Sequence, residues 1–336
     1  MLGRLLDLIR QNRPLRVALG LAVVGVIFYF LASSLVSGWG TLQEEEVRLN
    51  ATGLVVSALP LALAIVVISV PWILLLRHFA PKAPVRKSST FVAFMYSWLG
   101  RYVPGRLPFF LGKFYLATAI GYPKRVLIPV ITYEALIHIL VAGSAGGFLV
   151  LLATGIEVQR YFLLVALIFA LALALVLAFP RLLAPFLRLS AQLVQRDSSE
   201  TVPPLPRGQM LRISLVYLLA LVLNGLGLHL VISSMTSYSL TDLPLSIGAI
   251  GVAGSLGMLS FFAPAGLGVR EGTLVVILSV TLSVEMAALV AIAMRIIATA
   301  VDLLLVGAVS VYDLAWGDRL IGVVLGAPVT VRDPSS

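Results

Sequence analysis

The sequence contains no cysteine and only three histidines, and each shortage excludes a kind of chemistry. Without cysteine the chain forms no disulfide and offers no thiol nucleophile or thiolate metal ligand. The histidines His78, His138 and His229 stand far apart in the sequence, so we expect no metal site. A G-x-x-x-x-G-K-[ST] phosphate loop is also missing, because Leu107 stands where the first glycine before Gly112-Lys113 belongs. We therefore expect neither ATP hydrolysis nor a cofactor.

Charged residues are scarce as well, at 12% of the 336 residues, whereas hydrophobic residues make up 60%. A chain of this composition cannot surround an apolar core with a polar surface, which excludes a water-soluble globular protein. Apolar runs of about 20 residues are long enough to span a bilayer as helices. Six such runs occur, at residues 17–36, 54–76, 126–153, 161–179, 213–235 and 287–312. We predict an all-α polytopic membrane protein with six full transmembrane helices.

Two further apolar stretches, residues 91–120 and 244–280, are interrupted by proline and glycine. Each stretch is long enough for two short helices, and we interpret both as broken, re-entrant hairpins. Helices that cross the membrane completely also fit these lengths. Both interpretations add an even number of crossings, so the charges of the loops do not decide between them.

The net charge of +9 reflects the orientation of the chain in the membrane and not nucleic-acid binding. This follows because the basic residues concentrate in alternate loops. If the N-terminus is cytoplasmic, the outer loops keep only Arg48 and Arg160. We therefore predict a multi-pass plasma-membrane protein with both termini in the cytoplasm. Residues 17–36 are longer than the apolar core of a typical signal peptide, which favours a retained first span. Trp39, Trp72, Trp98 and Trp316 fall near predicted span ends, as interfacial anchors do.

The chain overlays itself when the numbering is shifted by about 160 residues. Span 54–76 then falls on 213–235, and the first hairpin falls on the second, with Pro104-Gly105 beside Pro264-Ala265-Gly266. Between corresponding positions of the two repeats the chain crosses the membrane three times. Because three is an odd number, the second repeat is inverted relative to the first. We predict one membrane domain over residues 1–336. Its parts are repeat 1, a connecting span with a basic cytoplasmic linker, repeat 2 and a short polar tail, at residues 54–153, 154–210, 211–312 and 313–336.

The breaks in the two hairpins are the predicted substrate site. A half-helix that begins at a break presents free N–H groups and the positive end of its dipole, which favour an anion. Basic residues near the breaks mark a polar cavity, because an arginine at the centre of a bilayer costs about 2.5–3.5 kcal/mol. The predicted substrate-binding residues are Arg101, Tyr102, Pro104, Gly105, Arg106, Lys113, Pro264, Gly266, Gly268, Arg270, Glu271 and Arg295. In the alternative interpretation, Arg101 and Arg106 reach the cytoplasmic headgroup layer and hold the hairpin there.

Further charges lie on the long third helix predicted for each repeat. Glu134 and His138 are four residues apart on one face, and Arg295 and Asp302 are seven residues apart on one face. We expect Glu134 to pair with Arg295, or Arg295 with Asp302, because pairing lowers the cost of burying each charge. Such a pair would join the two repeats as a static contact, whereas a free Glu134 or His138 could carry a coupling proton. We predict no catalytic residue among them.

Two motifs, in this order, resemble those of a known membrane family. They are GRYVPGR at residues 100–106 with Gly112-Lys113, and FAPAGLGVRE at residues 262–271, followed by Arg295. Over residues 10–315 the chain thereby resembles the lysylphosphatidylglycerol synthase transmembrane-region family of flippase-like membrane proteins. The resemblance implies a lipid-translocase fold and a place in pathways of phospholipids and polyprenyl-linked sugars. Members with synthase activity carry an additional soluble aminoacyl-transferase domain, so we do not expect this chain alone to make aminoacyl lipid.

Together these features predict a lipid translocase that moves an anionic headgroup across a bacterial-type plasma membrane without ATP hydrolysis. The headgroup would belong to a phospholipid or to a polyprenyl-phosphate-linked sugar, and the tail would stay in the lipid. Two alternatives stay open: an intramembrane enzyme that uses Glu134, Glu271 or Asp302 on a lipid phosphate or sugar, and a proton-coupled carrier of small anions. The partners that fit are the lipid substrate, a second copy of the chain, and lipid-modifying or glycosyltransferase enzymes. We expect no nucleic acid.

Overall fold

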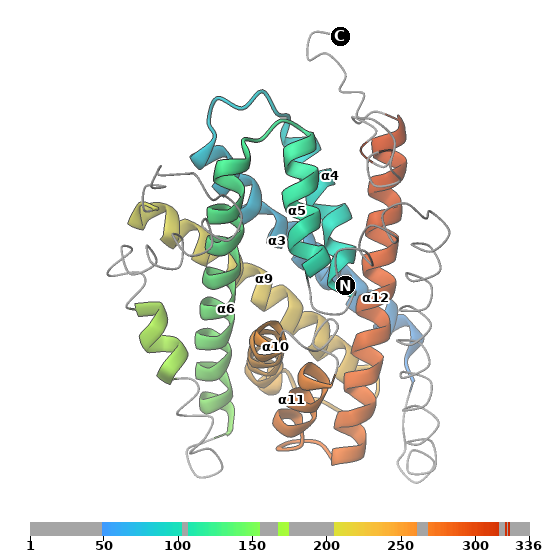
Figure 1. Cartoon of the computed structure of the whole chain (residues 1–336). Coiled ribbons are helices and arrows are strands. Elements are labelled where there is room, and N and C mark those ends of the chain that lie inside the picture. Colours follow the sequence, from blue (N-terminus) through green and yellow to red (C-terminus); the bar gives the residue numbers. More distant parts are fainter. Residues whose placement is uncertain are drawn as a thin grey trace, which may run out of the picture.

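The structure is a computed structural model, and it describes residues 49–102, 107–154, 167–174, 205–260, 268–315, 320 and 322. Every regular element within these ranges is a helix (Figure 1). Five helical segments are long and apolar enough to cross a membrane. They are α3 (Ala51–Phe79), α6 (Lys124–Thr154), α9 (Arg207–Ser233), the segment Leu240–Leu259 and α12 (Val284–Ala315). The described part of the chain is therefore that of an all-α, multi-pass membrane protein.

Four of the six predicted spans coincide with helices long enough to cross a membrane. The helices α3, α6, α9 and α12, each of 27 to 32 residues, cover the runs predicted at 54–76, 126–153, 213–235 and 287–312. The run predicted at 17–36 lies outside the described residues. Of the run at 161–179, the structure describes only 167–174, which are helical. Most of the predicted linker and tail also lie outside the described residues.

The first interrupted stretch, residues 91–120, contains two short helices and a turn of 3₁₀ helix. They are α4 (Lys87–Trp98), η1 (Leu99–Tyr102) and α5 (Leu107–Ala119). At about 1.5 Å per residue, the 12-residue α4 and the 13-residue α5 are each about 20 Å long. Both are shorter than the hydrocarbon core of a bilayer, which is about 30 Å thick.

The second interrupted stretch, residues 244–280, also divides into two helices. It contains most of α10 (Leu243–Leu259), which follows the 3₁₀ turn η3 (Leu240–Asp242), and all of α11 (Val269–Leu278). With η3, α10 forms a segment of 20 residues, which is long enough to cross, whereas α11 has ten residues. Outside the described residues lie the break positions Pro104, Gly105, Arg106, Pro264 and Gly266.

The helices α3 and α9 pack side by side through the centre of the molecule and run in opposite directions (Figure 1). The backbone N–H of Asn50, just before α3, donates to the carbonyl oxygen of Ser234, just after α9, at 2.9 Å. Asn50 also caps α3, because its Oδ1 accepts the N–H of Gly53 at 3.2 Å. A Cβ on Gly227 of α9 would lie 2.5 Å from the Leu61 side chain of α3. The two helices therefore approach each other more closely than larger side chains would allow.

The helices α6 and α12 flank this central pair and run in opposite directions, with α4 and α5 in the upper part of Figure 1 and α10 and α11 in the lower part. The helix α10 packs along α6 through small residues. A Cβ on Gly251 would lie 2.7 Å from the carbonyl oxygen of Ala142, and one on Gly146 would lie 2.9 Å from that of Gly248. Backbone therefore meets backbone at this contact, which fixes α10 against α6.

The close contact between α6 and α10 predicts that Gly251 does not tolerate a side chain. In Gly251→Ala, the new methyl group would meet backbone atoms, and we expect the free energy of unfolding to fall by about 1–3 kcal/mol. Gly307→Ala on α12 is the matched control, because a Cβ there meets nothing within 4 Å. Thermal unfolding in detergent measures both variants, and an unchanged midpoint for Gly251→Ala would contradict the packing.

Candidate functional site

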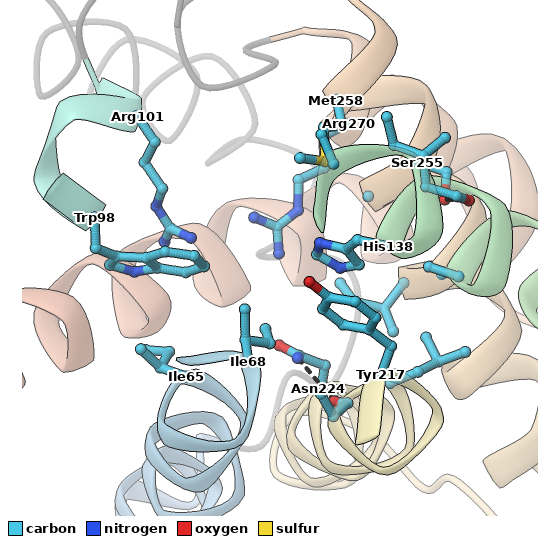
Figure 2. A pocket seen from close by; sticks show the side chains of 18 of the residues that line it. Ile65, Ile68, Trp98, Arg101, His138, Tyr217, Asn224, Ser255, Met258 and Arg270 are labelled. Carbon is cyan, nitrogen blue, oxygen red and sulfur yellow. Dashed lines mark hydrogen bonds between the residues drawn. The ribbon is translucent and has the colours of Figure 1, made fainter. Parts of the chain in front are cut away.

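A cavity of about 180 Å³ lies between the short helices and the long helices of the bundle (Figure 2). Its charged lining comes from η1, α5, α6, α11 and α12. The charged residues are Arg101, Lys113, Glu134, Arg270, Arg295 and Asp302. Four of the five basic residues predicted for the substrate site thus line one hollow, and the fifth, Arg106, lies outside the described residues. Much of the remaining wall is apolar and includes Ile68 of α3 and Phe110 of α5.

Asp302 is fully buried on α12 and accepts three hydrogen bonds from the end of α4 and from η1. Trp98 Nε1 donates to Oδ1 at 2.8 Å, and Arg101 Nη2 and Tyr102 OH both donate to Oδ2. The guanidinium carbon of Arg101 also lies 4.3 Å from the centre of a Trp98 ring. Hydrogen bonds to a carboxylate are strong when it is charged, so Asp302 holds η1 against α12 and fixes Arg101 at the cavity wall.

Lys113 and Glu134 form a deeply buried ion pair between α5 and α6. Lys113 Nζ donates to Glu134 Oε1 at 2.5 Å, and the two side chains are only 1% and 8% exposed. The ammonium nitrogen also lies 5.0, 4.6 and 4.3 Å from ring centres of Trp72, Phe94 and Phe109. Aromatic ring faces attract a cation and exclude water, so both charges depend on each other for neutralisation.

Arg295 contacts a carboxylate less closely. Its side chain is 4% exposed, and Nη1 donates to Glu271 Oε1 at 3.4 Å, a long hydrogen bond. The Nε and Nη2 atoms of Arg295 have no hydrogen-bond partner among the described residues. Glu271 Oε2 accepts the N–H of Gly268 at 2.8 Å, and Gly268 has a φ of +83°, which favours glycine. Arg295 therefore brings unused donors to the lining of the cavity.

Arg270 precedes Glu271 on α11 and extends into the cavity (Figure 2). Within the described residues it makes neither an ion pair nor a hydrogen bond. The other three lining cations each contact one carboxylate, whereas Arg270 does not. The cavity consequently carries an excess of positive charge, and a bound anion would neutralise it.

The predicted pairs of Arg295 with Glu134 and of Arg295 with Asp302 are wrong. Glu134 contacts Lys113 and Asp302 contacts Arg101, whereas Arg295 contacts Glu271. Arg295 and Asp302 do share a face of α12, but seven residues separate them by about 10 Å along the helix axis. Helical periodicity places a charge on a face, and it does not say which residue of a neighbouring helix fills the space opposite.

Four aromatic residues that line the cavity were not predicted as site residues: Trp98, Phe109, Phe110 and Tyr217. The Tyr217 ring of α9 stacks on His138, with the ring centres 4.7 Å apart and the planes 1° from parallel. Trp98, predicted as an interfacial anchor, instead lies under Arg101 in the cavity wall, and Trp72 is buried as well. Aromatic residues within apolar runs are common in the core of any helix bundle. The sequence therefore held no signal that assigned Tyr217 or Trp98 to the site.

The remaining predicted site residues lie close to these groups. Tyr102 accepts a hydrogen bond from Arg101 at 3.3 Å and places its ring 5.5 Å from the guanidinium carbon of Arg295. Gly268 is the N-cap residue of α11, and its N–H donates to Glu271. Among the described residues, no three histidine or acidic side chains gather closely enough to hold a metal ion.

Comparisons with known proteins add no family assignment. A scan of the chain against protein-family models gives no match, and a search of curated proteins gives none either.

Because Lys113 and Glu134 are buried as a pair, we predict that removing either one alone destabilises the protein. In Lys113→Met, the Glu134 carboxylate would stay buried without a counter-charge, and we expect a loss of about 3–5 kcal/mol in unfolding free energy. The double variant Lys113→Met, Glu134→Leu should recover most of this loss, because no unpaired charge remains. Denaturant unfolding in detergent measures both effects.

The matched control is Lys87→Met on the exposed start of α4, which should change the unfolding free energy by less than about 0.5 kcal/mol. A double variant as unstable as Lys113→Met alone would show that the lost stability does not come from the unpaired carboxylate.

Proposed function

We propose that this protein is a lipid translocase that moves an anionic lipid headgroup across a bacterial-type plasma membrane without ATP hydrolysis. The observation that carries the proposal is the cationic cavity, in which Arg270 has no ion-pair partner among the described residues and Arg295 has unused donors. A phosphate-bearing headgroup supplies the missing negative charge and the missing acceptors. The apolar wall formed by α3 and α5 suits the first carbons of a lipid tail that stays in the membrane.

The packing of the helices supports an inverted repeat as part of this proposal. If α3, α4, α5 and α6 are exchanged with α9, α10, α11 and α12, pairs that pack together become other pairs that pack together. The contact of α6 with α10 becomes that of α12 with α4, and the contact of α5 with α6 becomes that of α11 with α12. We propose on this basis that the short helix pairs are re-entrant hairpins that approach the cavity from opposite faces of the membrane, with both termini cytoplasmic.

The carboxylates of the cavity favour transport over catalysis. A general acid or base needs a proton-transfer position within reach of a substrate. Asp302 already accepts three hydrogen bonds, and Glu134 contacts Lys113 at 2.5 Å. Both groups hold the cavity together, and this gives an intramembrane enzyme less support than a binding site for an anion. A phospholipid and a polyprenyl-phosphate-linked sugar both carry a suitable headgroup.

The proposal predicts that Arg270→Gln abolishes movement of an anionic lipid. The purified chain is reconstituted in liposomes, and the transfer of labelled phosphatidylglycerol between leaflets is measured. Because Arg270 has no ion-pair partner among the described residues, its loss should lower the rate of lipid transfer at least about ten-fold. Folding should survive, because within the described residues Arg270 supports no ion pair.

Arg212→Gln, on the exposed first turns of α9, serves as the matched control and should leave the rate unchanged. Equal transfer rates for Arg270→Gln and the wild type would remove this cavity as the transport site. New covalent lipid species after incubation would instead support an enzyme, and uptake of soluble anions without lipid movement would support a carrier.

The cavity also predicts that a side chain at Gly254 blocks transport. Gly254 lines the cavity, and a Cβ there meets nothing within 4 Å, so Gly254→Leu should fold and fill part of the hollow. Gly307→Leu on α12 is the matched control, because the same addition enters open space at a position that does not line the cavity. The same liposome assay should show a loss of transfer for Gly254→Leu alone. Full activity in both variants would place the lipid path elsewhere.

A further inference from the structure

One edge of the Arg295 guanidinium is buried and has no hydrogen-bond partner among the described residues. The atoms Nε and Nη2 have no partner among the described residues, although the side chain is only 4% exposed and lines the cavity. These two nitrogens lie on the same edge of the planar group and form a fork that matches two oxygens of a carboxylate or phosphate. A buried donor that stays unmatched is destabilising, so this edge favours an oxyanion that enters the cavity.

Glu271 occupies the opposite side of the same guanidinium. Its Oε1 accepts from Nη1 at 3.4 Å, and its side chain is 20% exposed. Its Oε2 accepts the N–H of Gly268 at 2.8 Å, at the start of α11. The carboxylate would therefore keep one anchor after it leaves Arg295. It stands where the N-terminus of α11, Arg270 and Arg295 all favour negative charge.

The other two carboxylates near the cavity are held more firmly. Glu134 contacts Lys113 at 2.5 Å and is 8% exposed, and Asp302 is fully buried under three donors. Among the three, Glu271 has both the longest contact with its cation and the greatest exposure. An entering anion would displace the carboxylate with the weakest contact first.

We propose that Glu271 is a built-in competitor, whose carboxylate holds Arg295 until a phosphoryl oxyanion takes the unpaired Nε and Nη2 edge. This rests on the proposed function, because it treats the cavity as the place where a headgroup binds. The oxyanion contacts Arg295 and Arg270 in place of Glu271, which leaves Nη1 of Arg295 and keeps the N–H of Gly268. Glu271 thus sets the affinity of the site and returns to Arg295 when the anion leaves.

Binding to the purified full chain in detergent micelles tests this proposal by isothermal titration calorimetry. The probes are inorganic phosphate and a short-chain phosphatidic acid, which carry the same oxyanion with and without a lipid tail. Glu271→Gln keeps an oxygen for the N–H of Gly268 and removes the charge, and it should bind the probe about three-fold more tightly. Glu271→Asp keeps the charge on a side chain one carbon shorter, and it should also bind more tightly.

Arg295→Lys keeps the positive charge without the fork and should bind about ten-fold more weakly. Glu285→Gln, on the exposed first turn of α12, is the control and should bind like the wild type. Thermal midpoints close to that of the wild type establish that the variants are folded.

Equal affinity in the wild type, Glu271→Gln and Glu271→Asp would overturn the proposal. Tighter binding in Glu271→Gln alone would overturn it too, because the effect would then follow net charge rather than competition for Arg295. The proposal would also be overturned if neither probe bound to the wild type or to any variant. Tighter binding of phosphate, of the lipid or of both in the two Glu271 variants supports it, and the two probes separate a soluble oxyanion from a headgroup. If lipid transfer is absent while these shifts occur, the translocase proposal fails and the competitor role stands.

Discussion

A cation within a membrane bundle needs a counter-charge, because the surrounding low-dielectric medium does not stabilise it. Arg101, Lys113 and Arg295 each contact a carboxylate on a different helical element. Each of these contacts joins a short helix to a long one, so neutralisation of charge and docking of the short helices occur together. Arg270 also lines the cavity, but it forms no ion pair with the described residues.

The two halves of the proposed repeat use ion pairs of opposite polarity. In the first half the short helix α5 carries the cation Lys113 and the long helix α6 carries the acid Glu134. In the second half the short helix α11 carries the acid Glu271 and the long helix α12 carries the cation Arg295. The first pair is short and buried, whereas the second is long and partly exposed. The two ion pairs thus differ in length and exposure, and the unpaired donors of Arg295 lie in the second half.

Hydropathy was sufficient to locate α3, α6, α9 and α12, because an apolar run as long as a bilayer is thick is typical of a membrane-spanning helix and rare elsewhere. The cost of burying charge was sufficient to select Arg101, Lys113, Arg270 and Arg295, which line one cavity. The partners of these cations could not be predicted, because they depend on the distance and rotation between helices. Tyr217 was missed because a stacked tyrosine and a core tyrosine have the same sequence signature.

The antiparallel packing of α3 against α9 determines which parts of the bundle are firmly held. The hydrogen bond from Asn50 to Ser234 joins the start of α3 to the end of α9. The close packing of Gly227 against Leu61 holds the two helices together further along their length. The pair is thus tied at one end by a backbone hydrogen bond and closely packed at Gly227, which makes α3 and α9 a well-supported centre for the shorter helices around them. The short helices α5 and α11 each carry one salt bridge to a long helix, so any movement of a short helix away from its neighbour would have to break that ion pair.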